Sequence, residues 1–229
     1  MPISIVENVD CLVRMKETPD KFYDLALVDP PYGINRDNQK LTICKNPKHN
    51  RKQHLIKNWD SVIPNSLYFA ELFRISQNQI IWGANYFVEH LSKPSKAWIV
   101  WDKGQYGLSM SDCELAFSSF AKPTRIYKKN RFILNIEGTI HPTQKPVTLY
   151  KWLLQNYAKQ GDKIFDSHLG SQSSRIAAYD LGFDFWGTEL DADYFQAGCE
   201  RFERHIAQGN LFTAQVAPTP IQEGLNFND

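Results

Sequence analysis

The chain has 229 residues with a hydrophobic content of 42%, and its formal net charge at pH 7 is +1. This length and apolar content suit one α/β domain with a sizeable core and argue against a disordered chain. No apolar run approaches the roughly 18 residues of a membrane helix, and no secretory signal is visible. The four cysteines are scattered without a Cys-x-x-Cys pair, which favours a cytoplasmic protein without a zinc site.

Positive charge is concentrated in two segments of the chain. Residues 36–57 hold seven Lys and Arg and one acidic residue, and residues 122–131 hold five Lys and Arg and no acidic residue. The remainder of the chain is therefore acidic. Two basic segments on an acidic chain indicate contact with a polyanion, and aromatic residues interleaved with the second segment favour phosphate contact together with base stacking. For each segment the alternative is a solvated surface loop.

Hydrophobic periodicity and turn residues predict alternating strands and helices. Strands are expected at residues 3–9, 24–28, 79–82, 97–101, 114–118, 163–165 and 183–187. Helices are expected at residues 11–18, 64–77, 147–160, 175–181 and 192–208. This alternation predicts an α/β fold with a Rossmann-like, mostly parallel sheet and helices on both faces.

One domain over residues 1–212 accounts for these elements. Residues 34–60 and 118–140 are basic, weakly periodic insertions, and long irregular segments of this kind are usually functional. Residues 213–229 contain two prolines and little apolar content, so they are expected to form a flexible tail.

The apolar run at residues 25–28 ends in Asp29, and Pro30, Pro31 and Tyr32 follow it directly. Ligands bind outside the carboxyl ends of strands in open α/β sheets, so Asp29 is expected where chemistry occurs. Its carboxylate and the Pro30 carbonyl are two acceptors that suit the two N–H donors of a planar exocyclic amine. Accepting both bonds draws the nitrogen lone pair out of conjugation, so that it can attack an electrophilic methyl group. Tyr32 offers a flat face on which a flipped base can stack.

A second cluster follows a later predicted strand. Asp166 opens a loop of small residues that includes Gly170 and Ser171, and a helix comes next. Glu189 ends the following strand, 23 residues after Asp166. A strand, a small-residue loop, a helix and a later acid form the arrangement of nucleoside-cofactor sites, where the acid accepts hydrogen bonds from ribose. The alternative is an ordinary strand–helix loop, and the lack of Gly-x-Gly-x-x-Gly argues against a dinucleotide.

A third motif, His-Pro-Thr-Gln-Lys-Pro at residues 141–146, completes a recognisable set. Together the three motifs resemble the amino-methyltransferase family of S-adenosylmethionine-dependent DNA enzymes. Their order resembles the permuted (beta-type) adenine-N6 group of phages and bacteria, over most of the chain from about Val9 to about Phe202. Residues 80–87 and 111–115 are also similar to that group. The resemblance implies an antiparallel edge strand in the sheet.

The resemblance also implies a role for each matching residue. The catalytic residues would be Asp29, Pro30, Pro31 and Tyr32. The cofactor-binding residues would be Asp10, Thr143, Lys145, Asp166, Ser167, Gly170, Ser171 and Glu189. Asp10 would lie near the cofactor adenine, Glu189 at the ribose, and Thr143 and Lys145 near the methionine end. The implied cofactor is S-adenosylmethionine and the implied partners are DNA and a second copy of the chain, with no metal and no membrane.

Two positions depart from the family pattern. Ser167 and His168 replace the usual Pro-Phe pair, and Gln172 stands where the family usually has its second Gly. A side chain at that point either approaches the cofactor or requires a positive φ angle. A non-enzymatic alternative therefore stays open, in which the chain is a DNA-binding module with a decayed cofactor loop.

The residue types at the expected catalytic positions distinguish adenine N6 from other methyl acceptors. Cytosine C5 methylation needs a cysteine nucleophile, and the chain has no Pro-Cys dipeptide. Cytosine-N4 enzymes use the same geometry but more often carry Ser in place of Asp29, and glutamine-modifying enzymes typically carry Asn there. Cys44, His49 and His54 match no zinc spacing. The expected function is site-specific methylation of adenine N6 in DNA by a bacterial or phage enzyme, as in restriction-modification, with cytosine N4 as the alternative.

Overall fold

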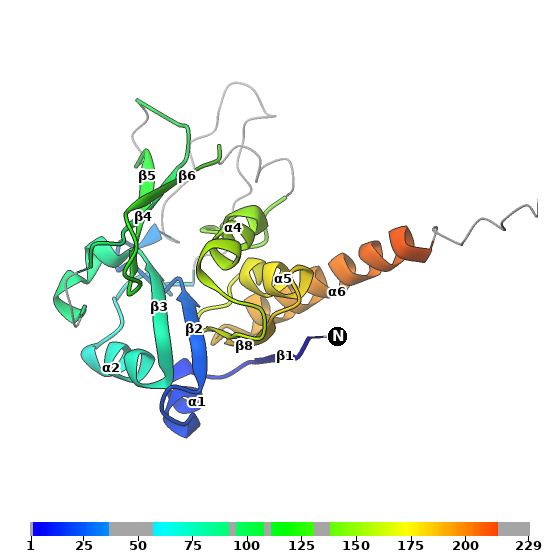
Figure 1. Ribbon diagram of the computed structural model, residues 1–229, viewed down its shortest axis with the longest axis horizontal. Helices are drawn as coiled ribbons and strands as arrows, with labels where there is room; N and C mark the ends of the chain where they lie inside the picture. Colours follow the sequence, from blue (N-terminus) through cyan, green and yellow to red (C-terminus); the bar gives the residue numbers. More distant parts are fainter. Residues whose placement is uncertain (1, 37–56, 92–94, 108–110, 131–137, 215–229) are drawn as a thin grey trace, which may run out of the picture.

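The computed structural model describes residues 2–36, 57–91, 95–107, 111–130 and 138–214. Within these ranges, eight strands form one sheet in the order β1-β8-β7-β2-β3-β5-β4-β6 (Figure 1). The strands are β1 (Ser4–Glu7), β2 (Tyr23–Val28), β3 (Ser76–Trp82), β4 (Ile99–Asp102), β5 (Cys113–Ser118), β6 (Arg125–Lys128), β7 (Lys163–Asp166) and β8 (Asp184–Thr188). The helices are α1 (Cys11–Glu17), α2 (Ser66–Ile75), α4 (Val147–Tyr157), α5 (Ser173–Asp180) and α6 (Ala192–Ala214).

The sheet is mostly parallel, which confirms the predicted fold class. β2 pairs in parallel with β3 and β7, and β8 pairs in parallel with β7 and β1. The antiparallel strand is β5, which lies between β3 and β4. The prediction of an antiparallel strand at the edge of the sheet is therefore wrong. The edge strands β1 and β6 run parallel to their neighbours, and the antiparallel strand lies inside the sheet. β5 follows β4 in the chain and pairs with it in an antiparallel direction, from Ile99 opposite Ala116 to Asp102 opposite Cys113.

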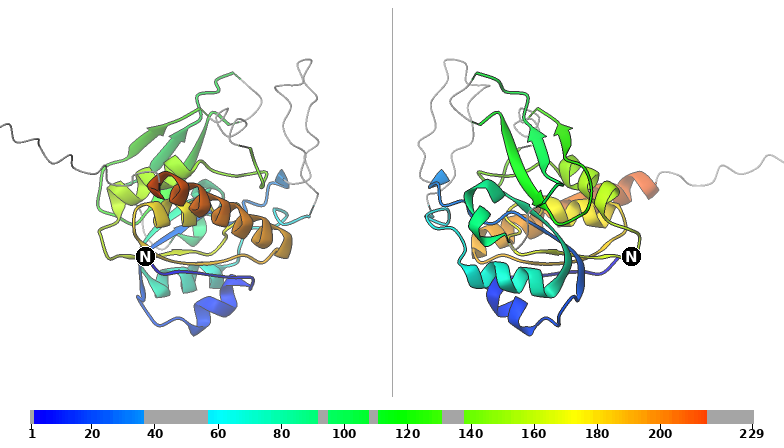
Figure 2. Two further views of the ribbon diagram at one scale, coloured as in Figure 1. Left: turned by 90° about the vertical axis from the view of Figure 1, so that its right-hand side faces the viewer. Right: turned by 60° about the vertical axis from the view of Figure 1, so that its left-hand side comes forward.

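Helices cover both faces of the sheet, with α1 and α2 on one face and α4, α5 and α6 on the other (Figure 2). Successive residues of a strand point to opposite faces, so β2 contributes to both cores. Leu25 and Leu27 pack toward α4 and α5, and Ala26 and Val28 pack toward α1 and α2. Burial on both faces explains why β2 reads as a continuous apolar run.

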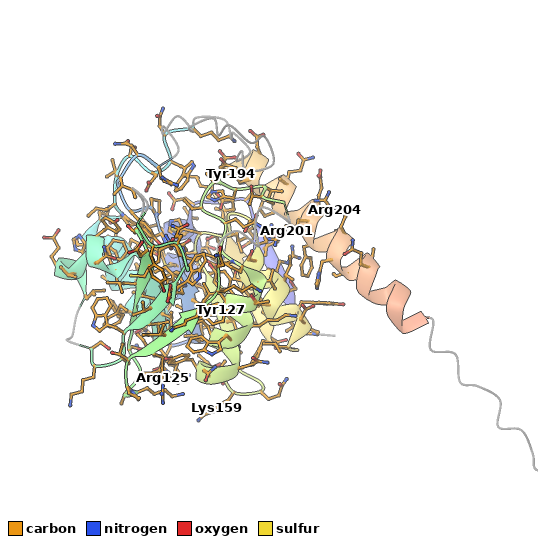
Figure 3. The ribbon with its side chains drawn as sticks, turned by 90° about the horizontal axis from the view of Figure 1, so that it is seen from above. Arg125, Tyr127, Lys159, Tyr194, Arg201 and Arg204 are labelled. Carbon is orange, nitrogen blue, oxygen red and sulfur yellow. The ribbon has the colours of Figure 1, made fainter. Side chains whose placement is uncertain are left out.

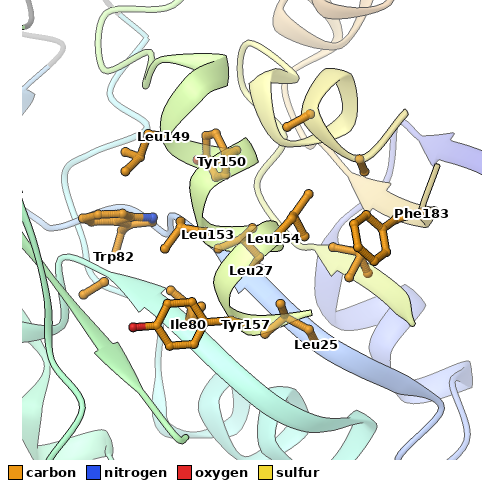
Figure 4. Packing of buried hydrophobic residues seen from close by; sticks show 14 of the residues in the cluster. Leu25, Leu27, Ile80, Trp82, Leu149, Tyr150, Leu153, Leu154, Tyr157 and Phe183 are labelled. Carbon is orange, nitrogen blue, oxygen red and sulfur yellow. The ribbon is translucent and has the colours of Figure 1, made fainter. Parts of the chain in front are cut away.

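The core beneath α4 is the larger of the two apolar clusters. Figure 4 shows Leu149, Leu153 and Leu154 of α4 packed over Leu27 of β2 and Trp82 of β3. The 3–4 spacing of the leucines places them on one face of the helix, as their periodicity predicts. This packing fixes α4 over the ends of β2 and β3, and residues 141–146 lead directly into that helix.

Several element ends differ from the expectation by a few residues, as at α2, α4 and α6. α2 stops at Ile75, and β3 begins at Ser76, whose hydroxyl donates to the Leu72 carbonyl at 2.5 Å and closes the last helical turn. α6 continues to Ala214, so the first two residues of the expected tail are helical. Residues 215–229 lie outside the described ranges. β6 lies inside the segment 118–140, whose central part is thus an edge strand rather than irregular chain.

Candidate active site

A cavity of about 1490 Å³ opens along the carboxyl ends of the parallel strands. Its walls come from the end of β2, the loop after β7, the end of β8 and the segments around residues 57–65 and 141–145. Eleven of the twelve predicted site residues line it: Asp10, Asp29, Pro30, Pro31, Tyr32, Thr143, Lys145, Ser167, Gly170, Ser171 and Glu189. Segments far apart in the sequence thus meet at one rim, where open α/β sheets bind ligands.

Asp29 stands at the end of β2 with 15% of its side chain exposed. The Tyr32 hydroxyl donates to Oδ1 at 2.6 Å, and the Lys145 Nζ donates to Oδ2 at 2.5 Å. Burial raises the pKa of Asp29 above its ordinary value, whereas the charge of Lys145 acts to lower it. Two donors on its oxygens favour the ionised, acceptor form.

Lys145 lies directly against Asp29, and its expected place near the methionine end of the cofactor stays a prediction. Its Nζ is 3.1 Å from Oε2 of Glu114, and the other carboxylate oxygen of Glu114 is 2.8 Å from Nζ of Lys103. Four charges of alternating sign therefore run from β2 to β5 and the end of β4. Sequence reasoning missed Glu114 and Lys103, although residues 111–115 were a possible signal because they match the family.

Asp60 holds the backbone of the turn that follows Asp29. Its side chain is buried, and Oδ1 accepts from the backbone N–H groups of Tyr32 at 2.6 Å and Gly33 at 3.0 Å. Oδ2 accepts from the backbone N–H of Arg36 at 2.9 Å. The proline-rich turn has left the sheet, so these N–H groups need another acceptor, and one carboxylate supplies it. Asp60 belongs to no recognisable motif, so sequence reasoning had no signal by which to select it.

The ring of Tyr32 is held by the segment after β3. It stacks on Tyr86 with ring centroids 5.2 Å apart and an interplanar angle of 16°. Gly83 has a φ of +69°, and a Cβ there would lie 2.0 Å from the Tyr32 ring. Only a glycine lets the backbone approach so closely in this conformation. The family-like stretch at residues 80–87 therefore shapes the surroundings of Tyr32.

Asp166 is the predicted site residue that lies beneath the cavity wall instead of lining it. Its Oδ2 accepts from the Ser174 hydroxyl at 2.5 Å, and its Oδ1 accepts from the His168 backbone N–H at 3.1 Å. Burial raises the pKa of Asp166 to about 7. Asp166 thus ties the loop after β7 to the first turn of α5.

Glu189 and Gly170 join the ends of two neighbouring strands. Gly170 has a φ of +47°, and its backbone N–H donates to Oε2 of Glu189 at 2.8 Å. Oε1 of Glu189 accepts from the Asp191 backbone N–H at 2.9 Å. Burial raises the pKa of Glu189. The carboxylate is therefore fixed in the cavity wall beside the small-residue loop.

Gln172 adopts a left-handed backbone conformation with φ 58°. Its side chain is buried against α6, where Nε2 donates to the Phe195 carbonyl at 3.3 Å and Oε1 accepts from Arg175 at 2.9 Å. Gly198 of α6 leaves room for it, because a Cβ there would lie 2.7 Å from the Gln172 side chain. Gln172 is absent from the cavity lining, so its side chain does not obstruct the loop. The decayed-loop alternative loses its support.

The Ser167-His168 pair lines the cavity at the start of the same loop and forms polar contacts there. The Ser167 hydroxyl is 2.7 Å from the Tyr68 hydroxyl and 2.8 Å from Nδ1 of His168. Burial lowers the pKa of His168 to about 4, so the ring is neutral near pH 7. Side-chain hydrogen bonds thus hold the two residues that replace the Pro-Phe pair of the family pattern.

An aromatic group forms the wall above the loop. The His141 ring lies 5.0 Å from Trp59 and 4.4 Å from Tyr194, measured between ring centroids. Nζ of Lys57 bonds both carboxylate oxygens of Asp191, at 2.6 and 2.7 Å. Thr143 is fixed beside His141, since its hydroxyl lies 3.1 Å from Nδ1 of that ring. Residues 37–56 of the first basic segment lie outside the described ranges.

Other kinds of site receive no support from the described parts of the chain. Among those residues, no group of three or more His, Cys, Asp or Glu could hold a metal ion, and Cys44, His49 and His54 fall outside them. No helix in the described ranges has the length and apolar character needed to span a membrane.

The sheet and its rim define an α/β protein with a cavity between the loop after β7 and the carboxylate of Asp29. A family model described as "DNA methylase" and named for N6 and N4 methyltransferases matches residues 74–200, more than half of the chain. The chain therefore belongs to this family of DNA methylases.

One curated relative and two solved structures illustrate what the chain is similar to. YubD of Escherichia coli (strain K12), named as a methylase, is 26% identical over 216 residues, which cover 87% of this chain and 92% of that protein. TTHA0409 from Thermus thermophilus, in complex with S-adenosyl-L-methionine, has a TM-score of 0.58 at 17% identity and covers 89% of this chain and 95% of that chain. The cytosine-N4-specific PvuII DNA methyltransferase has a TM-score of 0.58 at 10% identity, with 91% and 93% covered.

Proposed function

We propose that the protein transfers a methyl group from S-adenosylmethionine to the N6 amine of an adenine in DNA, with release of S-adenosylhomocysteine and one proton. The observation that carries this proposal is the position of Asp29. Its carboxylate and Pro30 line the same cavity as the loop of Gly170 and Ser171. A base amine held at Asp29 and a nucleoside cofactor held at the loop can therefore meet in one space.

The residues of the cavity wall fit the cofactor. The loop backbone at Gly170 and Ser171 borders the cavity while Gln172 points away, so a nucleoside can approach the loop closely. Glu189 would accept hydrogen bonds from ribose hydroxyls, and Asp10 and Thr143 would contact the adenine and methionine ends. When bound, S-adenosylmethionine supplies an electrophilic methyl group on a sulfonium. Asp166 supports the loop from below.

The amine is activated by acceptors that this chain provides. Asp29 and the Pro30 carbonyl each accept one N–H bond, which directs the nitrogen lone pair toward the methyl group. Because a paired base cannot reach the rim, the target has to be flipped out of the duplex. Tyr32, stacked with Tyr86, supplies the aromatic surface beside it. Positioning and charge complementarity provide most of the acceleration.

Adenine is preferred to cytosine because Asp29 stands where cytosine-N4 enzymes more often have Ser. Cytosine N4 is the second candidate, since the geometry serves either amine and one structural neighbour is named as cytosine-N4-specific. Nucleoside analysis of methylated DNA separates the two: N6-methyladenine supports the proposal, and N4-methylcytosine keeps the mechanism and changes the base.

DNA contact is assigned to the two basic segments. Arg36 and Lys57 border the cavity at either end of the first, and Arg125 and Lys128 are exposed on β6 in the second. Exposed cations such as the two on β6 suit phosphate contact, which positions a duplex without reading its sequence. The enzyme would act in the bacterial cytoplasm, encoded by the bacterium or by a phage. It would form a homodimer and take part in restriction-modification.

Substitution of Asp29 tests this function directly. Asp29→Ala should abolish methyl transfer while cofactor affinity, measured by calorimetry, changes little, because the cofactor is held by the loop. Asp102→Ala is the matched control and should keep transfer, because this carboxylate at the end of β4 bonds the exposed Tyr106 hydroxyl outside the cavity lining. Retained turnover in Asp29→Ala would exclude the proposed mechanism.

A further inference from the structure

Lys145 is a cation enclosed inside the protein. Its side chain is 2% exposed, and its Nζ lies 5.3 Å from the centroid of the Trp82 ring and 5.6 Å from that of Tyr32. An ammonium ion in such a place is stable only when oxygen acceptors surround it. Its three N–H donors face three acceptors: Oδ2 of Asp29 at 2.5 Å, Oε2 of Glu114 at 3.1 Å and the Tyr32 hydroxyl at 3.1 Å.

Glu114 holds this cation from the side opposite Asp29. Its other carboxylate oxygen lies 2.8 Å from Nζ of Lys103, whose side chain is 6% exposed. The order Asp29, Lys145, Glu114, Lys103 therefore alternates in sign and sums to zero charge. A chain of this kind fixes the ammonium of Lys145 at a point set by two strands, β2 and β5.

We propose that Lys145 is a positioning residue for methyl transfer: it holds Asp29 ionised and oriented as an acceptor, and Glu114, anchored by Lys103, holds Lys145. This inference rests on the proposed function. A carboxylate offers about four lone-pair sites, and Lys145 and Tyr32 use two of them. Two sites remain for an incoming amine, but only while Asp29 stays ionised.

The charges around Asp29 act in opposite directions. Burial raises its pKa, Lys145 lowers it, and the negative charge of Glu114 raises it. The other titratable groups that interact electrostatically with Asp29 are Tyr32, Tyr68, Tyr150 and Asp166. Removing the charge of Lys145 should therefore raise the pKa of Asp29, and removing the charge of Glu114 should lower it.

Four variants test the proposal through the pH profile of kcat/KM. Lys145→Met should move the acidic limb to higher pH, and a shift of one pH unit lowers kcat/KM roughly tenfold at pH values on that limb. Glu114→Gln should move the limb to lower pH, and Lys145→Arg should restore part of the Lys145→Met shift. Lys151→Met is the control, because Lys151 pairs with Asp180 at 2.7 Å outside the cavity lining, and its profile should match the parent.

A second readout does not depend on turnover. In protein labelled at aspartate Cγ, the signal that disappears in Asp29→Asn reports Asp29, and its titration by NMR should shift upward in Lys145→Met and downward in Glu114→Gln. Unmoved titrations, or a loss of kcat/KM by one factor at every pH, would overturn the proposal. If Lys145→Met does not fold, the downward shift expected for Glu114→Gln decides the proposal. A parent protein that transfers no methyl group would refute the proposed function alone, because the titration still tests Lys145.

Discussion

At the residue scale, Gly83 determines where the Tyr32 ring can lie. Gly83→Ala should reduce kcat at least tenfold, because a Cβ 2.0 Å from the ring forces Tyr32 away from Asp29. Gly107→Ala is a close control: Gly107 also has a positive φ, +75°, and has nothing within 4 Å of an added Cβ. It should lose about 1 kcal/mol of stability and keep its turnover. Equal turnover in the two variants would contradict this role of Gly83.

His168 should make the protein sensitive to acid. Its pKa in the fold, about 4, lies below the ordinary value of 6.5, so the folded state favours the neutral ring. The stability from this group is therefore complete above pH 6.5 and is lost as the pH falls toward 4, by up to about 3 kcal/mol. Thermal unfolding of His168→Phe should vary less between pH 7.5 and pH 5 than that of the parent. An unchanged pH dependence would show that His168 is not buried as a neutral ring.

At the scale of elements, the turn after β2 depends on Asp60. Asp60→Asn replaces one acceptor oxygen by an N–H₂ group, which then faces a backbone N–H of Tyr32, Gly33 or Arg36. Urea unfolding should show a loss of about 1–3 kcal/mol, the cost of an unpaired buried group, together with reduced transfer. Asp162→Asn, in the exposed turn before β7, should leave both unchanged. A fully active Asp60→Asn variant would mean that this carboxylate does not hold the turn.

The contact between the loop, α5 and α6 makes a prediction about cofactor affinity. Gln172→Gly should bind S-adenosylmethionine within about twofold of the parent, because the Gln172 side chain faces Phe195 and Gly198 instead of the cavity. Calorimetry measures this directly. A large gain in affinity would show that the glutamine obstructs the loop, and it would return the decayed-loop alternative.

Across the whole molecule, binding to DNA should depend on salt through exposed cations. Figure 3 shows Arg125 at one side of the molecule, and Lys128 follows it on β6. Replacing both by Ala should weaken binding similarly for all sequences and reduce the slope of log K against log salt by about 2. Lys16→Ala on α1 is the control, and its slope should equal the parent's. An unchanged slope in the double variant would remove β6 from the DNA interface.

The sequence predicted the sheet and the main rim residues because these depend on local patterns. An apolar run that ends in Asp29, and small residues around Gly170, are readable from neighbours in the chain. Glu114 and Asp60 are not, because their roles arise from contacts with residues on other elements. The orientation of Gln172 likewise depends on Gly198 in a different helix. The position of β5 depends on how β4 turns back, which hydrophobic periodicity does not encode.

The most direct test of the central claim is methyl transfer from labelled S-adenosylmethionine to unmethylated bacterial DNA, followed by nucleoside analysis. The account predicts label in N6-methyladenine, and no label with Asp29→Ala. Label in N4-methylcytosine would correct the base but keep the chemistry at Asp29. Labelled DNA from Asp29→Ala, or no labelled base from a parent protein that binds the cofactor, would contradict the account.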